Sequence, residues 1–350
     1  MELTAPVWSL LAIVACQSVG AMFNSCTNGD ACIDIRQCDR FGPHHNEPSR
    51  WSTSLKHDFR SRVCQRESSN GVTVYKVCCP LSDRWRRKLD LLDLEQCGAY
   101  SDNRIAHGNK AALFQFPWMA LLRSGREWIC GGTLINERYV LTAAHCVWRT
   151  PIEFVRLGEY DLSRSIDCDM RGEVCAPTPQ DIVVEREIMH EDYSPRRKQN
   201  DIALLRLAYA ASINDNVFPI CLPVTPDMKP NFSKYVVAGW GSTENAISSS
   251  VLQFTELSLM AQDECLARLH EIDQYAKLFD TQMCAIGVKN LSDNCLGDSG
   301  GPLKSISVNA RFVQYGVVSF GLNSCGKKSA PGVYARVESY IDWILDKLEE

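Results

Sequence analysis

The sequence predicts an all-β fold, a barrel or sandwich of short strands, from about residue 105 onward, preceded by a small module held together by disulfides. Two observations predict it. Short apolar runs are separated by Gly, Pro and Asn, which is typical of folds with many short strands. The 17 cysteines among 350 residues are too many for a reducing compartment unless they bind metal. The apolar runs are Trp118–Leu122, Val140–Ala144, Ile202–Leu207, Tyr235–Trp240, Phe312–Phe320 and Val333–Val337.

The last residues have helical spacing, and Ser339 stands in front of them as a candidate cap. We therefore expect a C-terminal helix docked on the barrel. Its apolar positions are Tyr340, Ile341, Ile344, Leu345 and Leu348.

Composition excludes several classes of function. An apolar fraction of 45% supports a core, and the length fits about two domains. The net charge of −5, with basic residues scattered, gives no footprint for nucleic acid. No later run reaches the ~20 apolar residues of a membrane span. We therefore expect neither a nucleic-acid partner nor membrane attachment.

The first residues resemble a secretory signal peptide. A short apolar run, Val7 to Cys16, is followed by small residues, with Val19 and Ala21 at cleavage positions. A buried N-terminal helix is the alternative. Removal of residues 1–21 would take Cys16 with it and leave an even sixteen cysteines, as a fully paired extracellular protein needs.

A first group of six cysteines lies in the polar segment 26–79. Such a segment buries little apolar surface, so we expect disulfides to hold it, each contributing ~2–4 kcal/mol. Fifteen pairings of six cysteines are possible, and the adjacent Cys78 and Cys79 should bind different partners. A zinc site using His44, His45 and His57 is a weaker alternative, because the spacings are not of the C-x₂-C type.

Residues 80–104 are expected to be a linker. It holds the basic run Arg84 to Lys88, a Leu-rich patch and Cys97. Because Cys97 stands alone between two groups of cysteines, a long-range disulfide is expected.

Three strings supply the parts of an acyl-transfer site, namely a nucleophile, a base and an anion that orients the base. Ser299 lies in the glycine-rich string Gly297 to Leu303 (GDSGGPL). Glycines there allow close approach of a substrate, and the backbone N–H groups of Gly297 and Ser299 could stabilise an oxyanion. A plain surface turn is the alternative.

The other two strings are Leu141 to Cys146 (LTAAHC) and Asn200 to Leu205 (NDIALL). They offer His145 as the base and Asp201 as the anion. A carboxylate at the mouth of a buried strand is costly unless it is hydrogen-bonded, and orienting His145 would satisfy it. A structural histidine and a turn cap are the alternatives.

With these strings, residues 105–350 resemble the chymotrypsin/trypsin family. The order His, Asp, Ser matches that family, as do Cys130 (WICGGTLI), Gly239-Trp240-Gly241 and Pro331 to Tyr334. The resemblance implies two six-stranded antiparallel barrels, with His145, Asp201 and Ser299 in the cleft between them, and chemistry that requires no cofactor.

The same resemblance implies a pocket for Lys or Arg. Asp293 stands six residues before Ser299, where trypsin-like members have the acid of the pocket floor, and the walls correspond to Ser319, Gly321 and Gly332. Phe320 replaces the family's usual Trp. A buried carboxylate would pair with a cationic substrate side chain.

Arg104-Ile105 resembles the family's activation site. Cleavage after Arg104 would free an ammonium at Ile105, which would pair with Asp298 and order the site. Glu159 falls where some members bind calcium, although one carboxylate is weak support. Asn231 and Asn290 begin glycosylation sequons.

Cys78-Cys79-Pro80, closing six cysteines, resembles the CLIP domain of arthropod serine proteases. That resemblance implies a disulfide-knotted CLIP domain over 26–79. With the trypsin-like resemblance it implies eight disulfides, namely Cys26–Cys78, Cys32–Cys64, Cys38–Cys79, Cys97–Cys221, Cys130–Cys146, Cys168–Cys175, Cys265–Cys284 and Cys295–Cys325.

The first hypothesis is a secreted, trypsin-like serine endopeptidase zymogen in an extracellular cascade of innate immunity, melanisation or development. Its expected partners are a protein substrate such as another zymogen or a pro-ligand, an upstream activating protease and a serpin-type inhibitor. The alternative is a catalytically silent cofactor or binding protein on the same fold. A further hypothesis, compatible with the first, is that the CLIP domain recruits a partner surface.

Overall fold

The computed structural model describes residues 26, 30–38, 40–45, 47–69, 72–80, 88–99, 110–169, 171–228, 230, 233–241, 249–271, 273–287, 299–321 and 331–350. The expected signal peptide and activation site lie outside these residues. No helix of the described chain is long and apolar enough to span a membrane.

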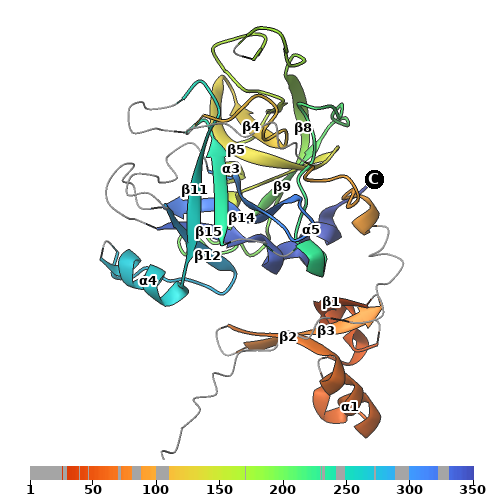
Figure 1. Cartoon of the computed structure of the whole chain (residues 1–350). Coiled ribbons are helices and arrows are strands. Elements are labelled where there is room, and N and C mark those ends of the chain that lie inside the picture. Colours follow the sequence, from red (N-terminus) through yellow and green to blue (C-terminus); the bar gives the residue numbers. More distant parts are fainter. Residues whose placement is uncertain are drawn as a thin grey trace, which may run out of the picture.

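The larger part of the chain forms two closed barrels of six antiparallel strands each, which confirms the expected fold (Figure 1). The first, in the order β4-β5-β6-β9-β8-β7, uses β4 (Met119–Ser124), β5 (Glu127–Asn136), β6 (Tyr139–Thr142), β7 (Phe154–Leu157), β8 (Gln180–Met189) and β9 (Ala203–Leu207). The second, in the order β10-β11-β12-β15-β14-β13, uses β10 (Lys234–Gly239), β11 (Gln253–Met260), β12 (Gln282–Gly287), β13 (Pro302–Ile306), β14 (Phe312–Gly321) and β15 (Gly332–Arg336).

Most of the apolar runs become strands because both faces of a packed barrel strand are covered. Every residue of β6, and all but Arg206 of β9, is buried. The run that begins at Val140 ends as a strand at Thr142, however, because Ala144 already starts the short helix α3 (Ala144–Val147).

The N-terminal part is a separate three-stranded antiparallel sheet in the order β1-β3-β2, with α1 (Thr53–Arg62) beside it. Ser52 caps α1 by accepting a hydrogen bond from the backbone of Leu55 at 3.1 Å. The sequence predicted that this N-terminal part buries little apolar surface. It instead has an apolar core, because Phe41 is fully buried between Trp51 and Phe59. Its strands and 3₁₀ turns are β1 (Asp30–Asp34), β2 (Val63–Ser69), β3 (Val72–Pro80), η1 (Ile35–Gln37), η2 (Gly42–His44) and η3 (Pro48–Arg50).

Residues 88–99, predicted as linker, are instead packed against the barrels. Leu92 is 2% exposed and belongs to the main core. Asn136 donates a hydrogen bond to the carbonyl of Leu91 at 3.0 Å. Gly98 donates to Pro219 and accepts from Phe312, both at 2.9 Å. We call residues 88–99 the strap.

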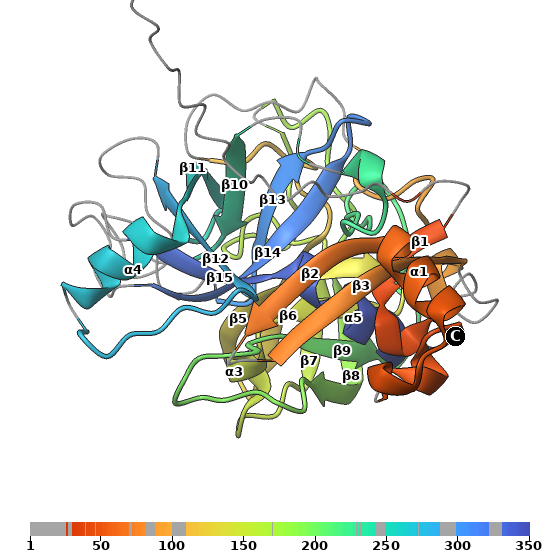
Figure 2. The same ribbon diagram turned by 90° about the horizontal axis from the view of Figure 1, so that it is seen from below.

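The C-terminal helix is present as α5 (Ile341–Lys347), with Ile344 and Leu345 buried. The predicted cap is wrong, because Ser339 lies inside the 3₁₀ turn η6 (Val337–Tyr340) and Tyr340 occupies the N-cap without a side-chain hydrogen bond. A helix continued directly from a 3₁₀ turn needs less side-chain capping, since that turn already uses part of the backbone. The N-terminal sheet lies on the α5 side of the barrels (Figure 1 and Figure 2).

Candidate active site

Asp201 is a buried carboxylate held by three hydrogen bonds. It lies immediately before Ile202 and β9, and its side chain is 4% exposed. The backbone N–H of His145 donates to Oδ1 at 2.8 Å, while His145 Nδ1 and Ser319 Oγ lie 2.8 Å and 2.5 Å from Oδ2. These donors offset the cost of burying the charge. With the Nδ1 proton directed at Asp201, His145 Nε2 is left to act as a base.

The position of His145 is fixed from both ends of α3. Ala143 and Ala144 are fully buried, and Cys146 forms a disulfide with Cys130 in β5. His145 itself is 29% exposed. The imidazole is therefore open to a substrate, whereas the acid that orients it is shielded from water.

The turn that contains Ser299 lies against the segments that lead to His145. The Ser299 carbonyl accepts a hydrogen bond from Gly131 N at 2.8 Å, next to Cys130. Gly300 has φ of +80°, and a Cβ there would collide with Thr142 Oγ1 and the carbonyl of Gly131. Only glycine allows this close approach. The predicted nucleophile Ser299 thus lies beside the segments that position the base His145, and His145 is hydrogen-bonded to the orienting acid Asp201.

Ser319 makes a contact with Asp201 that the sequence did not predict. It was expected only as a pocket wall, but its hydroxyl also donates to Asp201. No motif announces this contact, since it depends on the bulge that shifts the β14–β15 register between Val318 and Phe320. The other two expected walls face each other as the pair Gly321 and Gly332, and a Cβ on Gly321 would meet open space.

Asn200 and Tyr340 also support Asp201 without any signal in the sequence. Asn200 has a left-handed φ of 55°, which asparagine tolerates better than most residues. Its amide donates to the Asp192 carbonyl and accepts from Tyr340 Oη, both at 3.0 Å. Burial, with the charge of Asp201 nearby, raises the pKa of Tyr340 to about 12. The phenol therefore stays protonated and keeps donating.

Several expected residues lie outside the described chain, so their roles stay predictions. They are the pocket acid Asp293, the oxyanion donor Gly297, the activation residues Arg104, Ile105 and Asp298, the sequons at Asn231 and Asn290, and the disulfide Cys295–Cys325. The structure forms the other seven expected disulfides, namely Cys26–Cys78, Cys32–Cys64, Cys38–Cys79, Cys97–Cys221, Cys130–Cys146, Cys168–Cys175 and Cys265–Cys284.

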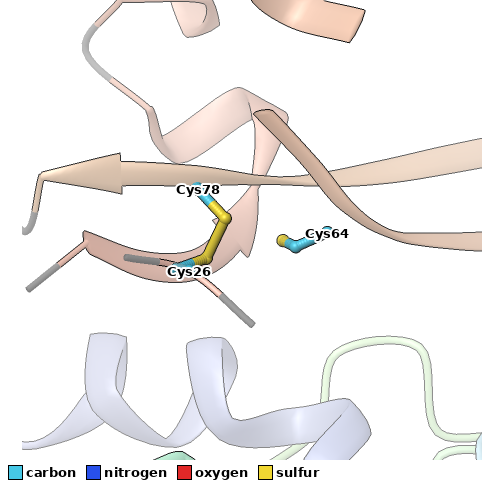
Figure 3. A group of neighbouring side chains, drawn as sticks. All are labelled: Cys26, Cys64 and Cys78. Atoms are coloured by element: carbon cyan, nitrogen blue, oxygen red, sulfur yellow. A yellow bond between two sulfur atoms is a disulfide. The ribbon is translucent and has the colours of Figure 1, made fainter. Parts of the chain in front are cut away.

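The structure does not favour zinc in the N-terminal unit. Cys26, Cys64 and Cys78 gather at one point, but Cys26 and Cys78 are bonded to each other (Figure 3), and Cys64 is bonded to Cys32. A sulfur in a disulfide cannot serve as the thiolate that zinc requires.

At Glu159, where calcium is predicted, both carboxylate oxygens already have partners. Glu159 Oε2 lies 3.2 Å from the guanidinium of Arg156, and Oε1 accepts from the backbone of Tyr160 at 3.0 Å. Burial and the neighbouring charge of Asp167 raise the pKa of Glu159. Asp167 Oδ1 is itself buried without a hydrogen-bond partner among the described residues, so calcium at these acids stays a prediction.

Comparisons with known proteins agree with this geometry. The family described as Trypsin matches residues 105–344. The chain is 38% identical to the CLIP domain-containing serine protease HP8 of Bombyx mori, over 97% of this chain and 96% of the relative. It is 40% identical to the Spaetzle-processing enzyme of Drosophila melanogaster, over 78% and 77%.

A solved structure matches both parts of the molecule. The crystal structure of the Drosophila Grass clip serine protease of the Toll pathway superposes with a TM-score of 0.67 at 32% identity, covering 91% of this chain and 94% of that one. The chain therefore belongs to the trypsin family, as a CLIP-domain serine protease.

Proposed function

We propose that this chain is the secreted zymogen of an endopeptidase that cleaves after Arg or Lys. The observation that carries the proposal is the buried Asp201, which orients His145 through Nδ1 at 2.8 Å beside the turn that contains Ser299. In this mechanism Ser299 Oγ attacks the peptide carbonyl while His145 Nε2 takes its proton. The proton passes to the leaving amine, and a water deprotonated by His145 then hydrolyses the acyl-enzyme.

The preference for a cationic residue rests on Asp293 and on the space beside Gly321, which pairs with Gly332. No described residue lies within 4 Å of a Cβ at Gly321, which leaves room for a long side chain, and Asp293 would pair with its charge. Replacing the acid removes the partner of a desolvated cation. We therefore expect Asp293→Ser to lower kcat/KM on Arg peptides by at least about a hundredfold, since a buried charge left unpaired costs ~3–5 kcal/mol.

Activation is proposed to follow cleavage between Arg104 and Ile105, with the new ammonium pairing with Asp298. The test treats wild type and Arg104→Gln with a trypsin-like protease and follows labelling of Ser299 by an organophosphonate. Wild type should be labelled only after cleavage, and the variant should stay unlabelled. Full labelling of the uncut variant would refute this switch.

A place in an extracellular cascade is supported by the relatives. One is called the Spaetzle-processing enzyme and another belongs to the Toll pathway. We propose that the substrate is likewise a zymogen or pro-ligand, that a serpin-type inhibitor limits the enzyme, and that the CLIP domain recruits a partner. Deleting residues 22–79 should abolish cleavage of the protein substrate and leave hydrolysis of short peptides. Equal loss of both would contradict a recruiting role.

A further inference from the structure

A short hairpin loop lies directly before Asp201. Ser194 and Gln199 pair through backbone hydrogen bonds of 3.0 and 3.3 Å, leaving Pro195 to Lys198 as an exposed tip. Lys198 has a left-handed φ of 50°. Its carbonyl accepts a 2.7 Å hydrogen bond from Gln282 of β12, a side chain only 2% exposed. The backbone of Lys198 is therefore fixed by a buried partner from the other barrel.

The tip of this loop is a cluster of three cations. Arg196, Arg197 and Lys198 are all exposed, and no acidic residue occurs from Ser194 to Asn200. Within the part of the chain described here, none of the three forms an ion pair, and Arg197 only donates to Ser194 Oγ at 3.4 Å. We call these three residues the basic tip.

Two exposed acids precede the loop, Glu191 and Asp192, and Glu191 already has partners. Glu191 pairs with Lys347 at 2.5 Å and accepts from the Trp343 indole at 2.9 Å. Both partners belong to α5, so Glu191 is turned toward that helix.

Lys198 reaches across the site to β14. Its Nζ lies 4.3 Å from the centroid of the Phe320 ring, a distance typical of a cation–π contact. Phe320 directly follows Ser319, whose hydroxyl bonds Asp201. The ammonium of Lys198 is therefore held at the rim of the catalytic residues instead of moving freely in solvent.

This rim coincides with an open strand edge. The β13 side of β14 is paired as far as Val318, which exchanges backbone hydrogen bonds of 2.9 Å with Gly300 and Gly301. Beyond it, Ser319 to Gly321 have no backbone partner on that side among the residues the structure describes. An extended peptide can pair with such an edge and place alternate side chains on either face.

We propose that the basic tip, led by Lys198, selects substrates with acidic residues shortly before the cleaved Arg or Lys. The inference rests on the proposed specificity, because a cationic side chain bound beside Gly321 would put the preceding residues along the edge of β14. A carboxylate there would pair with the ammonium of Lys198, which lies over the Phe320 ring. Arg196 and Arg197 are next to Lys198 and add positive charge. A basic residue at the same place meets like charge.

The test uses the full-length protein, cleaved after Arg104, with active sites titrated by labelling of Ser299. The substrates are quenched fluorescent peptides that share one Arg and carry Asp, Asn or Lys at the second, third or fourth residue before it. At the best position we expect the kcat/KM of the Asp peptide to exceed that of the Asn peptide by about two- to fivefold, as for an exposed ion pair. The Lys peptide should have the lowest kcat/KM. Raising NaCl from about 0.05 M to about 0.5 M should reduce the ratio.

Lys198→Gln should bring the Asp-to-Asn ratio close to one, and Lys198→Glu should invert it. Lys234→Gln, which removes an equal charge at an exposed pair with Glu256, should keep the wild-type ratio. Each ratio is taken within one variant, so partial misfolding does not affect it. An unchanged Asp-to-Asn ratio in Lys198→Gln, or a wild-type preference for Lys over Asp, would overturn the inference and leave the Arg specificity intact. Failure to cleave every Arg and Lys peptide would overturn both.

Discussion

At the scale of single residues, the site depends on how completely the charge of Asp201 is satisfied. Three donors reach it, two from His145 and one from Ser319. In the proposed mechanism, the carboxylate stabilises the imidazolium that forms when Ser299 loses its proton. The Ser319 bond holds that carboxylate toward Nδ1, so in the proposed mechanism Ser319 is a positioning residue, in addition to its predicted place in the pocket wall.

Removing the Ser319 hydroxyl should therefore lower kcat more than it raises KM. A hydrogen bond to a charged group contributes ~1.5 kcal/mol or more, so Ser319→Ala should cost about tenfold in kcat. The measurement is steady-state hydrolysis of an Arg peptide, per active site titrated. Ser305→Ala offers a matched control. Ser305, in β13, is also buried, and its hydroxyl donates a hydrogen bond of 2.7 Å to the carbonyl of Lys234 in β10. A similar loss in both variants would mean that Ser319 acts only through stability.

Glu191 links the loop before Asp201 to α5 in a pH-dependent way. Burial opposes its ionisation, but hydrogen bonds from Lys347, its own backbone and Trp343 outweigh burial and lower its pKa from 4.5 to about 2. For a carboxyl with a lowered folded-state pKa, the stabilisation is present above pH 4.5 and is lost as pH falls toward 2.

Glu191→Gln should accordingly destabilise the zymogen at neutral pH by less than ~1 kcal/mol, since the pair is largely exposed. The difference from wild type should shrink as pH falls from about 5 to about 3. Urea unfolding at both values measures it, with Glu127→Gln at the exposed start of β5 as the charge control. A difference that grows toward low pH would contradict the assigned pair.

At the scale of elements, apolar continuity predicted strands well where both faces are buried and poorly where they are not. β6 and β9 follow directly from their sequences. β8 does not, because only Ile182 among its ten residues is fully buried. It closes the barrel through backbone pairing with β7 and β9 and through ion pairs such as Arg156 with Asp181 at 2.7 Å. Ion pairs between neighbouring strands leave no hydrophobic periodicity in the sequence, so β8 could not be predicted from it.

The pairing of His145 with Asp201 could be predicted because their two strings are local and distinctive. The supporting contacts of Ser319, Asn200 and Tyr340 could not, since each joins segments more than a hundred residues apart. The strap was missed for a similar reason. Leu92 belongs to a short Leu-rich patch, and only the folded barrel offers the surface that covers it.

Truncating Leu92 tests whether the strap is part of the core. Leu92→Ala should lower the free energy of unfolding of the zymogen by ~2–4 kcal/mol, as for a buried leucine. Leu162→Ala, at a partly buried position on the edge of the same core, should cost less. Denaturant midpoints compare the two. Equally small losses of unfolding free energy in both variants would show that the strap lies on the surface of the barrels without stabilising them.

At the scale of the whole molecule, two kinds of contact tie the N-terminal unit to the protease. Cys97–Cys221 bridges 124 residues of sequence. Around it, Arg311 donates to the Cys97 carbonyl at 2.9 Å, and Lys88 donates to the carbonyl of Leu348. Cleavage after Arg104 would therefore leave the unit attached both covalently and through packing.

The double variant Cys97→Ser with Cys221→Ser separates these contributions. After cleavage, wild type should migrate as one species on a non-reducing denaturing gel, whereas the variant should give two. On native size exclusion the variant should still elute as one complex, because Leu92 and the backbone bonds of Gly98 remain. Adding Leu92→Ala should make that complex dissociate on dilution, since ~2–4 kcal/mol is then lost from binding and not from folding alone. Immediate separation of the double variant would show instead that the disulfide alone holds the two parts together.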